Sequence, residues 1–467
     1  MVRTRGGGMS ATRPGPGASR PYRFPRAIEG ETANGLRIIV LPMPARPLAS
    51  AQLILPSGAS AESRERSGIT AALARLLTEG GERHDADALV EASELLGAKI
   101  SADAGWESLV VGATLPAGRL AGILDLIAEI TLAPRLPARE IERVKALRLA
   151  AIDQAHASPR ARASEALIAA IYDPSAAYSR PAGGTRESVA AIDRTALLER
   201  HDQMLAAGRP TIVIAGELDP AATIRAVQES PLAALTGGSA SASGKADAAS
   251  SASGERDGAP HLLLLDRPGS VQSELRIGRI GRSRLDPLFH AALVHSEILG
   301  GLFGSRLNRV LREEKGYTYG AAAGFEFRRG RGPFTARTAV ESSVTADALT
   351  EARTQLGSLA TEPATEEELA AARRYLRGTF PLRFGTPAAV AGAVVALVAN
   401  DLAVDELDRF QSSVDAVPPR AVGQVAEELA AEQERIVVVG DAASIAAPLR
   451  DAGFEVEVRS ESAKGES

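Results

Sequence analysis

The chain has 467 residues, of which 45% are hydrophobic, so it can bury a large core and its length predicts more than one domain. Its 53 basic and 58 acidic residues give a formal net charge of −5, which provides no electrostatic footprint for nucleic acid or an anionic membrane. The sequence contains no cysteine, which excludes disulfide frameworks, thiol nucleophiles and Cys-ligated zinc.

The two ends of the chain have compositions typical of unstructured segments. Residues 1–26 contain six arginines and no acid, with Gly, Pro and Ser between them and no apolar run long enough for a secretory signal. We interpret them as a disordered leader, and residues 459–467 as a disordered tail. The Arg-rich start also resembles an organellar transit peptide, but a second Met at position 9 and the Pro content count against that interpretation. We therefore expect a cytoplasmic protein.

A composition break divides the rest of the chain into two blocks. Residues 236–260 are almost wholly Gly, Ala, Ser and charge, as is typical of a flexible linker. On either side, residues 27–235 and 261–458 share one order of features. Each block opens with apolar stretches, continues into helices and closes on an apolar strand followed by Gly and an acid, at residues 211–217 and 435–441. This repeat predicts two similar α+β domains.

The first block contains an amphipathic helix within SGITAALARLLTEGG, residues 67–81. Apolar side chains recur at the spacing of one buried face, at positions Ile69, Ala72, Leu73, Leu76 and Leu77. The other face is expected to carry Ala71, Ala74 and Arg75. A zinc peptidase helix needs two His one turn apart and a nearby Glu, and none of the six His residues forms such a pair. We expect these histidines to be surface or locally hydrogen-bonded residues.

Other catalytic signatures are also missing. The sequence has no Gly-x-Ser-x-Gly nucleophile elbow, and Gly244-Lys245 lacks the remainder of a phosphate loop. The longest apolar run, residues 388–399, falls short of the ~18 to 20 residues that span a bilayer and is expected to be a buried helix.

The second block holds one informative stretch, residues 297–327. A helix is expected to end at the glycine pair 300–301, a second to cover Ser305 to Glu314, and a strand to cover Tyr317 to Phe327. Arg312 would then lie near the helix end and Tyr319 near the strand start, where both could donate hydrogen bonds to a peptide carbonyl. Residue types alone favour the structural interpretation, a solvated helix-end Arg312 and a half-buried strand Tyr319.

With these motifs in place, the chain resembles the M16 metallopeptidases, the pitrilysin and insulinase group that includes the mitochondrial processing peptidases. The resemblance covers nearly all of residues 27–458. The matching segments are NGLRIIVLP (34–42), the helix from Gly68, GAKISADAGWE (97–107), REIERVKALRLAAIDQ (139–154) and LGGLFGSRLNRVLREEKGYTYG (299–320). It implies an α+β, M16/LuxS-like metallohydrolase fold of two homologous domains, each an antiparallel sheet packed with helices, joined by the linker.

In active members of this family the first helix carries the inverted zinc motif HxxEH, and a Glu on a later helix is the third ligand. The two His positions correspond to Ala71 and Arg75, the base to Ala74 and the third ligand to Ala151. Alanine cannot bind zinc and Arg75 would repel it, so the resemblance implies a chain without its own metal or catalytic base. Arg75 has about the reach needed to fill the space of an ion; whether it pairs with Glu107 or another acid is open.

The family's substrate-binding Arg and Tyr match Arg312 and Tyr319, with Tyr317 as the competitor if the register slips by two. The resemblance therefore implies a non-catalytic, substrate-binding subunit of a heterodimeric zinc endopeptidase. An HxxEH-containing M16 partner would supply the zinc, and the pair would process peptides without nucleic acid or membrane. The alternative is a metal-free M16-fold scaffold or core subunit of a larger assembly. A peptidase active alone is disfavoured by the missing ligands.

Overall fold

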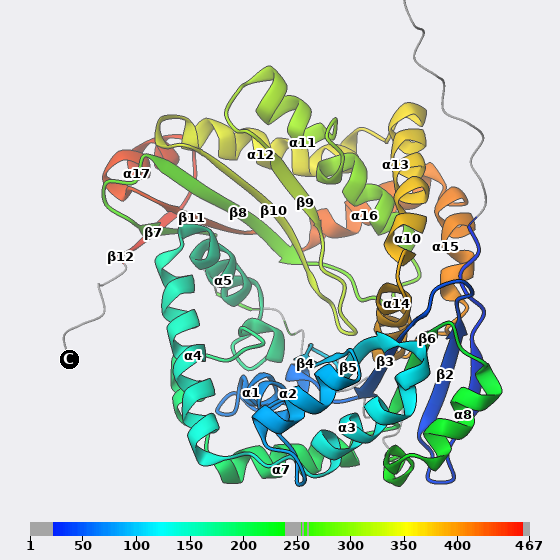
Figure 1. The fold of residues 1–467 in the computed structure, drawn as a ribbon. Helices are drawn as coiled ribbons and strands as arrows, with labels where there is room; N and C mark the ends of the chain where they lie inside the picture. The colour runs from blue at the N-terminus through cyan, green and yellow to red at the C-terminus, as the bar shows by residue number, and fades with distance from the viewer. Residues whose placement is uncertain (1–21, 239–253, 255, 259–260, 461–467) are drawn as a thin grey trace, which may run out of the picture.

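The computed structural model describes residues 22–238, 254, 256–258 and 261–460 (Figure 1). Most of the predicted leader, linker and tail lies outside these residues. The described chain forms two six-stranded sheets with strand orders β1-β2-β6-β3-β5-β4 and β12-β7-β11-β8-β10-β9. Five successive strands correspond between the sheets, from β2 and β7 to β4 and β9. The predicted α+β class and the two homologous domains are thus confirmed.

The inner strands of each sheet coincide with apolar stretches of the sequence. In the first sheet they are β1 (Ile28–Glu31), β2 (Arg37–Pro42), β3 (Leu48–Leu55), β4 (Lys99–Ala104), β5 (Leu109–Pro116) and β6 (Thr211–Gly216). In the second sheet they are β7 (Leu262–Asp266), β8 (Gln272–Ile280), β9 (Ala321–Phe325), β10 (Pro333–Glu341), β11 (Arg435–Gly440) and β12 (Val456–Ser460).

The sheets differ from the expected antiparallel sheets in one respect, because both are mixed. β2 pairs with β6 in parallel, and β7 pairs in parallel with both β11 and β12. The remaining pairs are antiparallel. Each parallel pair joins strands that are separated in the chain by helices, which parallel pairing requires.

The helices follow the same repeat. The first half contains α1 (Ile69–Leu77), α2 (Ala86–Leu95), α3 (Leu120–Leu132), α4 (Ala138–Ala157), α5 (Pro159–Ile171), α6 (Arg186–Ala190), α7 (Arg194–Ala206) and α8 (Pro220–Glu229). The second half contains α10 (Phe289–Ser296), α11 (Arg306–Asn308), α12 (Thr345–Thr361), α13 (Glu366–Thr379), α14 (Pro387–Ala399), α15 (Glu406–Asp415), α16 (Pro419–Ala431) and α17 (Ala442–Asp451). Two π-helical segments, η5 (Glu297–Gly301) and η6 (Arg309–Glu314), continue α10 and α11.

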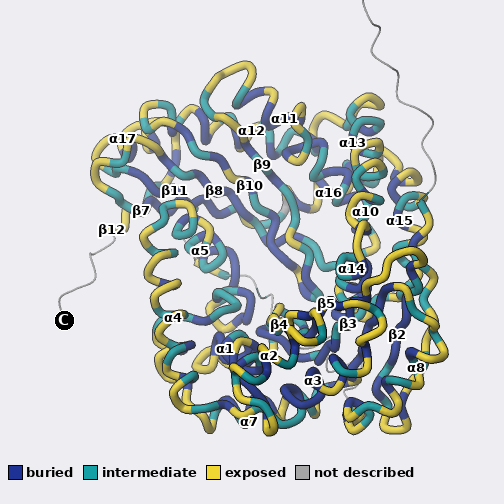
Figure 2. The backbone as a smooth tube through the Cα atoms, viewed as in Figure 1, coloured by how far each residue is buried: buried dark blue, intermediate teal, exposed yellow. Residues whose placement is uncertain are grey.

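Each sheet is covered on one face by helices of its own half and on the other by one helix from the opposite half. α5 packs on β11 and β8 of the second sheet, and α14 packs on β3 and β6 of the first (Figure 1). Both faces of the central strands are therefore buried (Figure 2). This explains why β6 and β11 have continuous apolar sequences rather than alternating polar and apolar residues.

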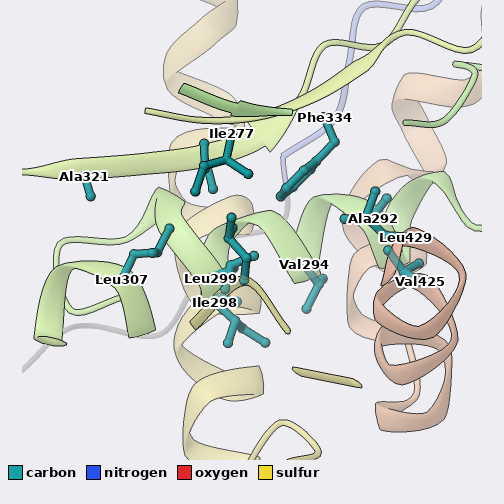
Figure 3. Close-up of a cluster of buried hydrophobic side chains, with 14 of the residues drawn as sticks. Ile277, Ala292, Val294, Ile298, Leu299, Leu307, Ala321, Phe334, Val425 and Leu429 are labelled. Atoms are coloured by element: carbon teal, nitrogen blue, oxygen red, sulfur yellow. The ribbon is translucent and has the colours of Figure 1, made fainter. Parts of the chain in front are cut away.

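The core of the second half lies between its sheet and α10, α11 and α16. Figure 3 shows Ile277 and Phe334 of the sheet facing Leu299 of η5, Leu307 of α11 and other side chains of this helical layer. The predicted helix end at the glycine pair 300–301 is confirmed, since η5 ends at Gly301.

The predicted leader is wrong at its last residues. Phe24 is buried and contacts the Phe384 ring edge-on at 5.0 Å between centroids, and Tyr22 stacks on Phe384 at 5.6 Å. These aromatic side chains attach the start of the described chain to the apolar core of the second half.

The apolar run at 388–399 lies in α14, a helix that packs on the first sheet. Among the described residues no single helix is long and apolar enough to cross a membrane. The pair Glu366–Phe384 and Pro387–Ala399 reaches that length and composition together but is bent by 116°.

Candidate functional site

The start of α1 is held by a buried carboxylate. Glu62 accepts hydrogen bonds from the backbone N–H groups of Gly68 and Thr70, each at 2.7 Å. Gly68 has a φ of 87°, which favours glycine at the helix entry. Burial raises the pKa of Glu62, while the Thr70 and Gly68 hydrogen bonds and the charge of Arg200 act in the opposite direction. The helix that matches the zinc helix is therefore firmly positioned.

The four positions aligned with the zinc site carry no ligand side chain. The five apolar residues predicted to face the core are buried, as is Ala74, which had been expected on the opposite face with Ala71 and Arg75. α1 packs against α4, α7 and the first sheet, so its buried face is wider than the apolar spacing indicated. Ala71 is half-buried, and Ala151 is exposed on α4.

Arg75 pairs with an acid of its own helix end. Its Nη2 lies 3.6 Å from Oε1 of Glu79, and its side chain is 60% exposed. Glu107, the other candidate, instead accepts hydrogen bonds from Tyr178 Oη at 2.6 Å and Ser60 Oγ at 3.1 Å. Glu79 also accepts a hydrogen bond from Arg143 Nη2 of α4 at 2.6 Å. Glu79 thus links the end of α1 to α4, the helix that carries Ala151.

These residues do not fit a catalytic zinc ion. Three methyl side chains and one guanidinium occupy the aligned positions, and none of them can donate an electron pair to a metal. In the part of the chain that the structure describes, no group of three or more His, Asp or Glu is placed to hold a metal ion.

A pocket of about 460 Å³ lies beside Ala151, between α4, α5 and the segment 179–187. Its wall includes Arg328 from the second half, whose guanidinium lies 4.3 Å from the Trp106 ring centroid. Arg148 also lines it and donates from Nε to the Gly183 carbonyl at 2.7 Å. Burial lowers the pKa of Arg148. This pocket was not predicted from the sequence, although Trp106, Arg148, Ala151 and Ile152 of its wall lie in segments that resemble the family.

The two predicted substrate-binding residues lie on neighbouring segments, Arg312 in η6 and Tyr319 just before β9. Arg312 donates from Nη2 to the Phe303 carbonyl at 3.1 Å and to Glu313 at 2.8 Å, and its guanidinium carbon lies 3.5 Å from the Phe303 ring centroid. Tyr319 is 100% exposed. Within the described residues no hydrogen bond joins Arg312 to Tyr319.

The strand predicted from Tyr317 begins instead at Ala321. Thr318 Oγ1 accepts from the Gly320 N–H at 3.1 Å and donates to the Gly320 carbonyl at 3.0 Å. This local turn occupies backbone groups that a strand ladder would need. Tyr317 and Tyr319 therefore both precede the strand, and a slip of strand register does not exchange them.

The segment with Tyr319 is nevertheless attached to the helix with Arg312 at both of its ends. The Tyr317 N–H donates to the Leu311 carbonyl at 2.9 Å, and the Ala321 N–H donates to Asn308 Oδ1 at 2.9 Å. Tyr317 is half-buried against the second core, whereas Tyr319 faces solvent. Of the two tyrosines, Tyr319 is the one available to a ligand.

Known proteins with similar sequences belong to a peptidase family that includes inactive domains. A family model described as insulinase, peptidase family M16, matches residues 37–182, and one described as the peptidase M16 inactive domain matches residues 191–376. A protein of Mycobacterium leprae described as an uncharacterized zinc protease is 25% identical over 345 residues, which is 74% of this chain and 76% of that protein. A Mycobacterium tuberculosis H37Rv protein of the same description is 24% identical over 346 residues, 74% of this chain and 77% of its own.

Solved structures share the fold. The peptidase M16 inactive domain from Pseudomonas fluorescens superposes with a TM-score of 0.78 at 23% identity, covering 89% of this chain and 98% of that one. A protease from Helicobacter pylori gives a TM-score of 0.78 at 15% identity, covering 89% of this chain and 100% of its own.

Proposed function

The chain belongs to peptidase family M16, and we propose that it acts there as a non-catalytic, substrate-binding subunit of a heterodimeric zinc endopeptidase. One contrast carries the proposal. The positions aligned with the zinc ligands hold only alanines and an arginine, while a fully exposed Tyr319 stands on a segment bonded to the Arg312 helix. A side chain exposed on a segment held so firmly is suited to contact a ligand.

In this role Arg312 and Tyr319 would grip the backbone of a peptide. A guanidinium has five N–H donors, and among the described residues only Nη2 of Arg312 has hydrogen-bond acceptors, the Phe303 carbonyl and Glu313. The N–H groups on Nε and Nη1 therefore remain for a peptide carbonyl, and the Tyr319 hydroxyl is a further donor. Such donors would stabilise the oxygen as negative charge develops on it.

The bond-breaking chemistry would come from the partner. A second M16 subunit carrying HxxEH would hold zinc, which supplies an activated water for attack on the carbonyl. This chain would orient the substrate so that the attack is productive. We propose a cytoplasmic location for the complex.

A metal-free scaffold role is the second candidate. The observation that favours it is that Arg312 already has two oxygen partners and the Phe303 ring, which a purely structural helix-end arginine would also have.

Cleavage of a quenched fluorescent peptide library separates the two roles. The library would be incubated with this chain, with the HxxEH homologue of the same genome, and with an equimolar mixture. We expect activity only in the mixture, reduced at least tenfold by Arg312→Ala or Tyr319→Phe. Arg309→Ala, on the same helical segment and paired with Glu314 at 3.7 Å, is the matched control. A homologue fully active alone and unaffected by mixing would support the scaffold role.

Metal content provides a second test. Zinc should be present in the partner and absent from this chain after dialysis. One zinc per isolated chain would contradict the proposal.

A further inference from the structure

The second sheet leaves a groove of about 370 Å³ beside the Tyr319 segment. α5 covers β11 and β8, and beyond it the same face of β10 and β9 is open. Small residues, among them Gly320 and Ala322, line the groove together with Arg160, Arg276 and Arg337. Gly320 directly follows Tyr319, so the groove lies next to the residues that we propose bind the substrate.

The three arginines of this groove come from three elements, and two of them oppose each other in the sheet. Arg276 of β8 and Arg337 of β10 are register partners. Like charges directly opposite each other on paired strands destabilise a sheet. Arg160 approaches from the first turn of α5, where its carbonyl accepts a hydrogen bond from Arg276 Nη2 at 3.3 Å.

Arg276 is the buried member, with 3% of its surface exposed. It is ion-paired with Glu274 at 2.9 Å and donates from Nε to Ser164 Oγ at 3.1 Å. Burial lowers the pKa of Arg276; the nearby Glu274 opposes this, and the charges of Arg160 and Arg337 lower it further. The groove therefore contains three cations and one carboxylate.

The other two guanidiniums are exposed and unpaired. Within the described residues, the side chains of Arg160 and Arg337 have no hydrogen bond and no ion pair, although many surface arginines of this chain have an acidic partner. Although the chain has a net charge of −5, the groove thus presents the unpaired guanidiniums of Arg160 and Arg337 beside the buried Arg276. Such an arrangement is complementary to an anion that would occupy the groove.

We propose that the groove binds a carboxylate of the peptide substrate, so that this subunit prefers peptides that place a carboxylate there. The proposal rests on the proposed function, because it places the ligand next to Tyr319. An extended peptide held by Tyr319 would continue across β9 and bring a carboxylate between Arg160 and Arg337. The carboxylate belongs either to an acidic side chain or to the free C-terminus of the peptide.

Three labelled peptides of equal length distinguish these sources. The first contains internal Glu and an amidated C-terminus, the second has Gln in place of Glu and a free C-terminus, and the third has Gln and an amidated C-terminus. Binding to the full chain mixed with its HxxEH homologue would be measured by fluorescence anisotropy, with zinc chelated so that no cleavage occurs. We expect the first or the second peptide to bind about tenfold more tightly than the third.

The double variant Arg160→Gln/Arg337→Gln should abolish this advantage and leave binding of the third peptide unchanged. Arg420→Gln, an exposed arginine of α16 outside the groove, should retain the advantage. Raising the ionic strength from about 0.15 M to about 1 M should reduce the advantage as well.

Equal binding of the three peptides, or a carboxylate preference that survives in the double variant, would overturn the proposal. If all peptides bind alike and Tyr319→Phe weakens them all, the substrate-binding role stands and only the carboxylate selectivity fails. If no peptide binds and the mixture cleaves none, both fail together.

Discussion

The backbone N–H of Ala321 donates a hydrogen bond to Oδ1 of Asn308 at 2.9 Å, which joins the first residue of β9 to the last residue of α11. The Asn308 amide group also donates from Nδ2 to the Leu302 carbonyl and to Ser305 Oγ. One buried side chain thus fixes the glycine-rich turn before α11 and the segment that presents Tyr319.

Asn308→Ala should destabilise the protein by about 1–3 kcal/mol, because the buried Ala321 N–H loses its acceptor. The midpoint of urea denaturation measures this loss. Hydrogen exchange should increase most in residues 315–321. Asn308→Asp retains an acceptor for Ala321 and should protect that amide better than Ala does. Equal exchange in the two variants would argue against the hydrogen bond as the anchor.

Arg75→Ala should change stability by at most about 1 kcal/mol, since the Arg75–Glu79 pair is largely solvent-exposed. Arg143→Ala should be more damaging, because it removes the 2.6 Å hydrogen bond to Glu79, whose side chain is only 10% exposed. Thermal unfolding of both variants compares them directly. A larger loss for Arg75→Ala would mean that Arg75 has a structural role at the former metal position.

Gly278→Ala should cost about 1–3 kcal/mol, because a Cβ at this position of β8 would lie 2.7 Å from Cδ2 of Leu167 in α5. The control is Gly357→Ala within α12, where a Cβ meets no atom within 4 Å. That change should stabilise the protein by up to about 1 kcal/mol, since alanine favours the helix. Similar effects of the two substitutions in urea denaturation would contradict the packing of α5 on the second sheet.

His295 should make the protein less stable as the pH falls. Burial lowers its pKa to about 3, and the charges of Arg282 and Arg306 act in the same direction. The unfolded chain, with a pKa of about 6.5, therefore binds a proton that the folded chain rejects. The free energy of unfolding should decrease from about pH 6.5 towards pH 3, by up to about 1.4 kcal/mol per pH unit for this group.

His295→Leu should remove this part of the pH dependence. In the comparison of unfolding free energies between pH 4 and 7, His261→Gln serves as the control at a partly exposed histidine. An unchanged slope for His295→Leu would show that other groups cause the acid sensitivity.

The sequence by itself determined the features that depend on neighbouring residues. The apolar spacing of residues 69–77 gave the helix and most of its buried face, and the matching apolar runs at 211–216 and 435–440 gave corresponding strands of two sheets. The absence of zinc ligands at Ala71, Arg75 and Ala151 is likewise a property of residue identity, which folding cannot alter.

Local chemistry also explains why the strand predicted from Tyr317 begins only at Ala321. Apolar and aromatic content indicated a strand from Tyr317, but the Thr318 hydroxyl competes for the backbone groups of Gly320. Propensity averages over a window, whereas this turn depends on the geometry of one side chain.

Only the tertiary structure decided which distant residues meet. The exchange of α5 and α14 between the halves and the convergence of Arg160 with Arg276 and Arg337 both join elements that are far apart in the chain. Periodicity states that a face is apolar and must be buried, but the hydrophobic effect is non-directional and does not specify the partner. The partner is fixed by shape and by the pairing of buried polar groups, which exist only once the whole chain has packed.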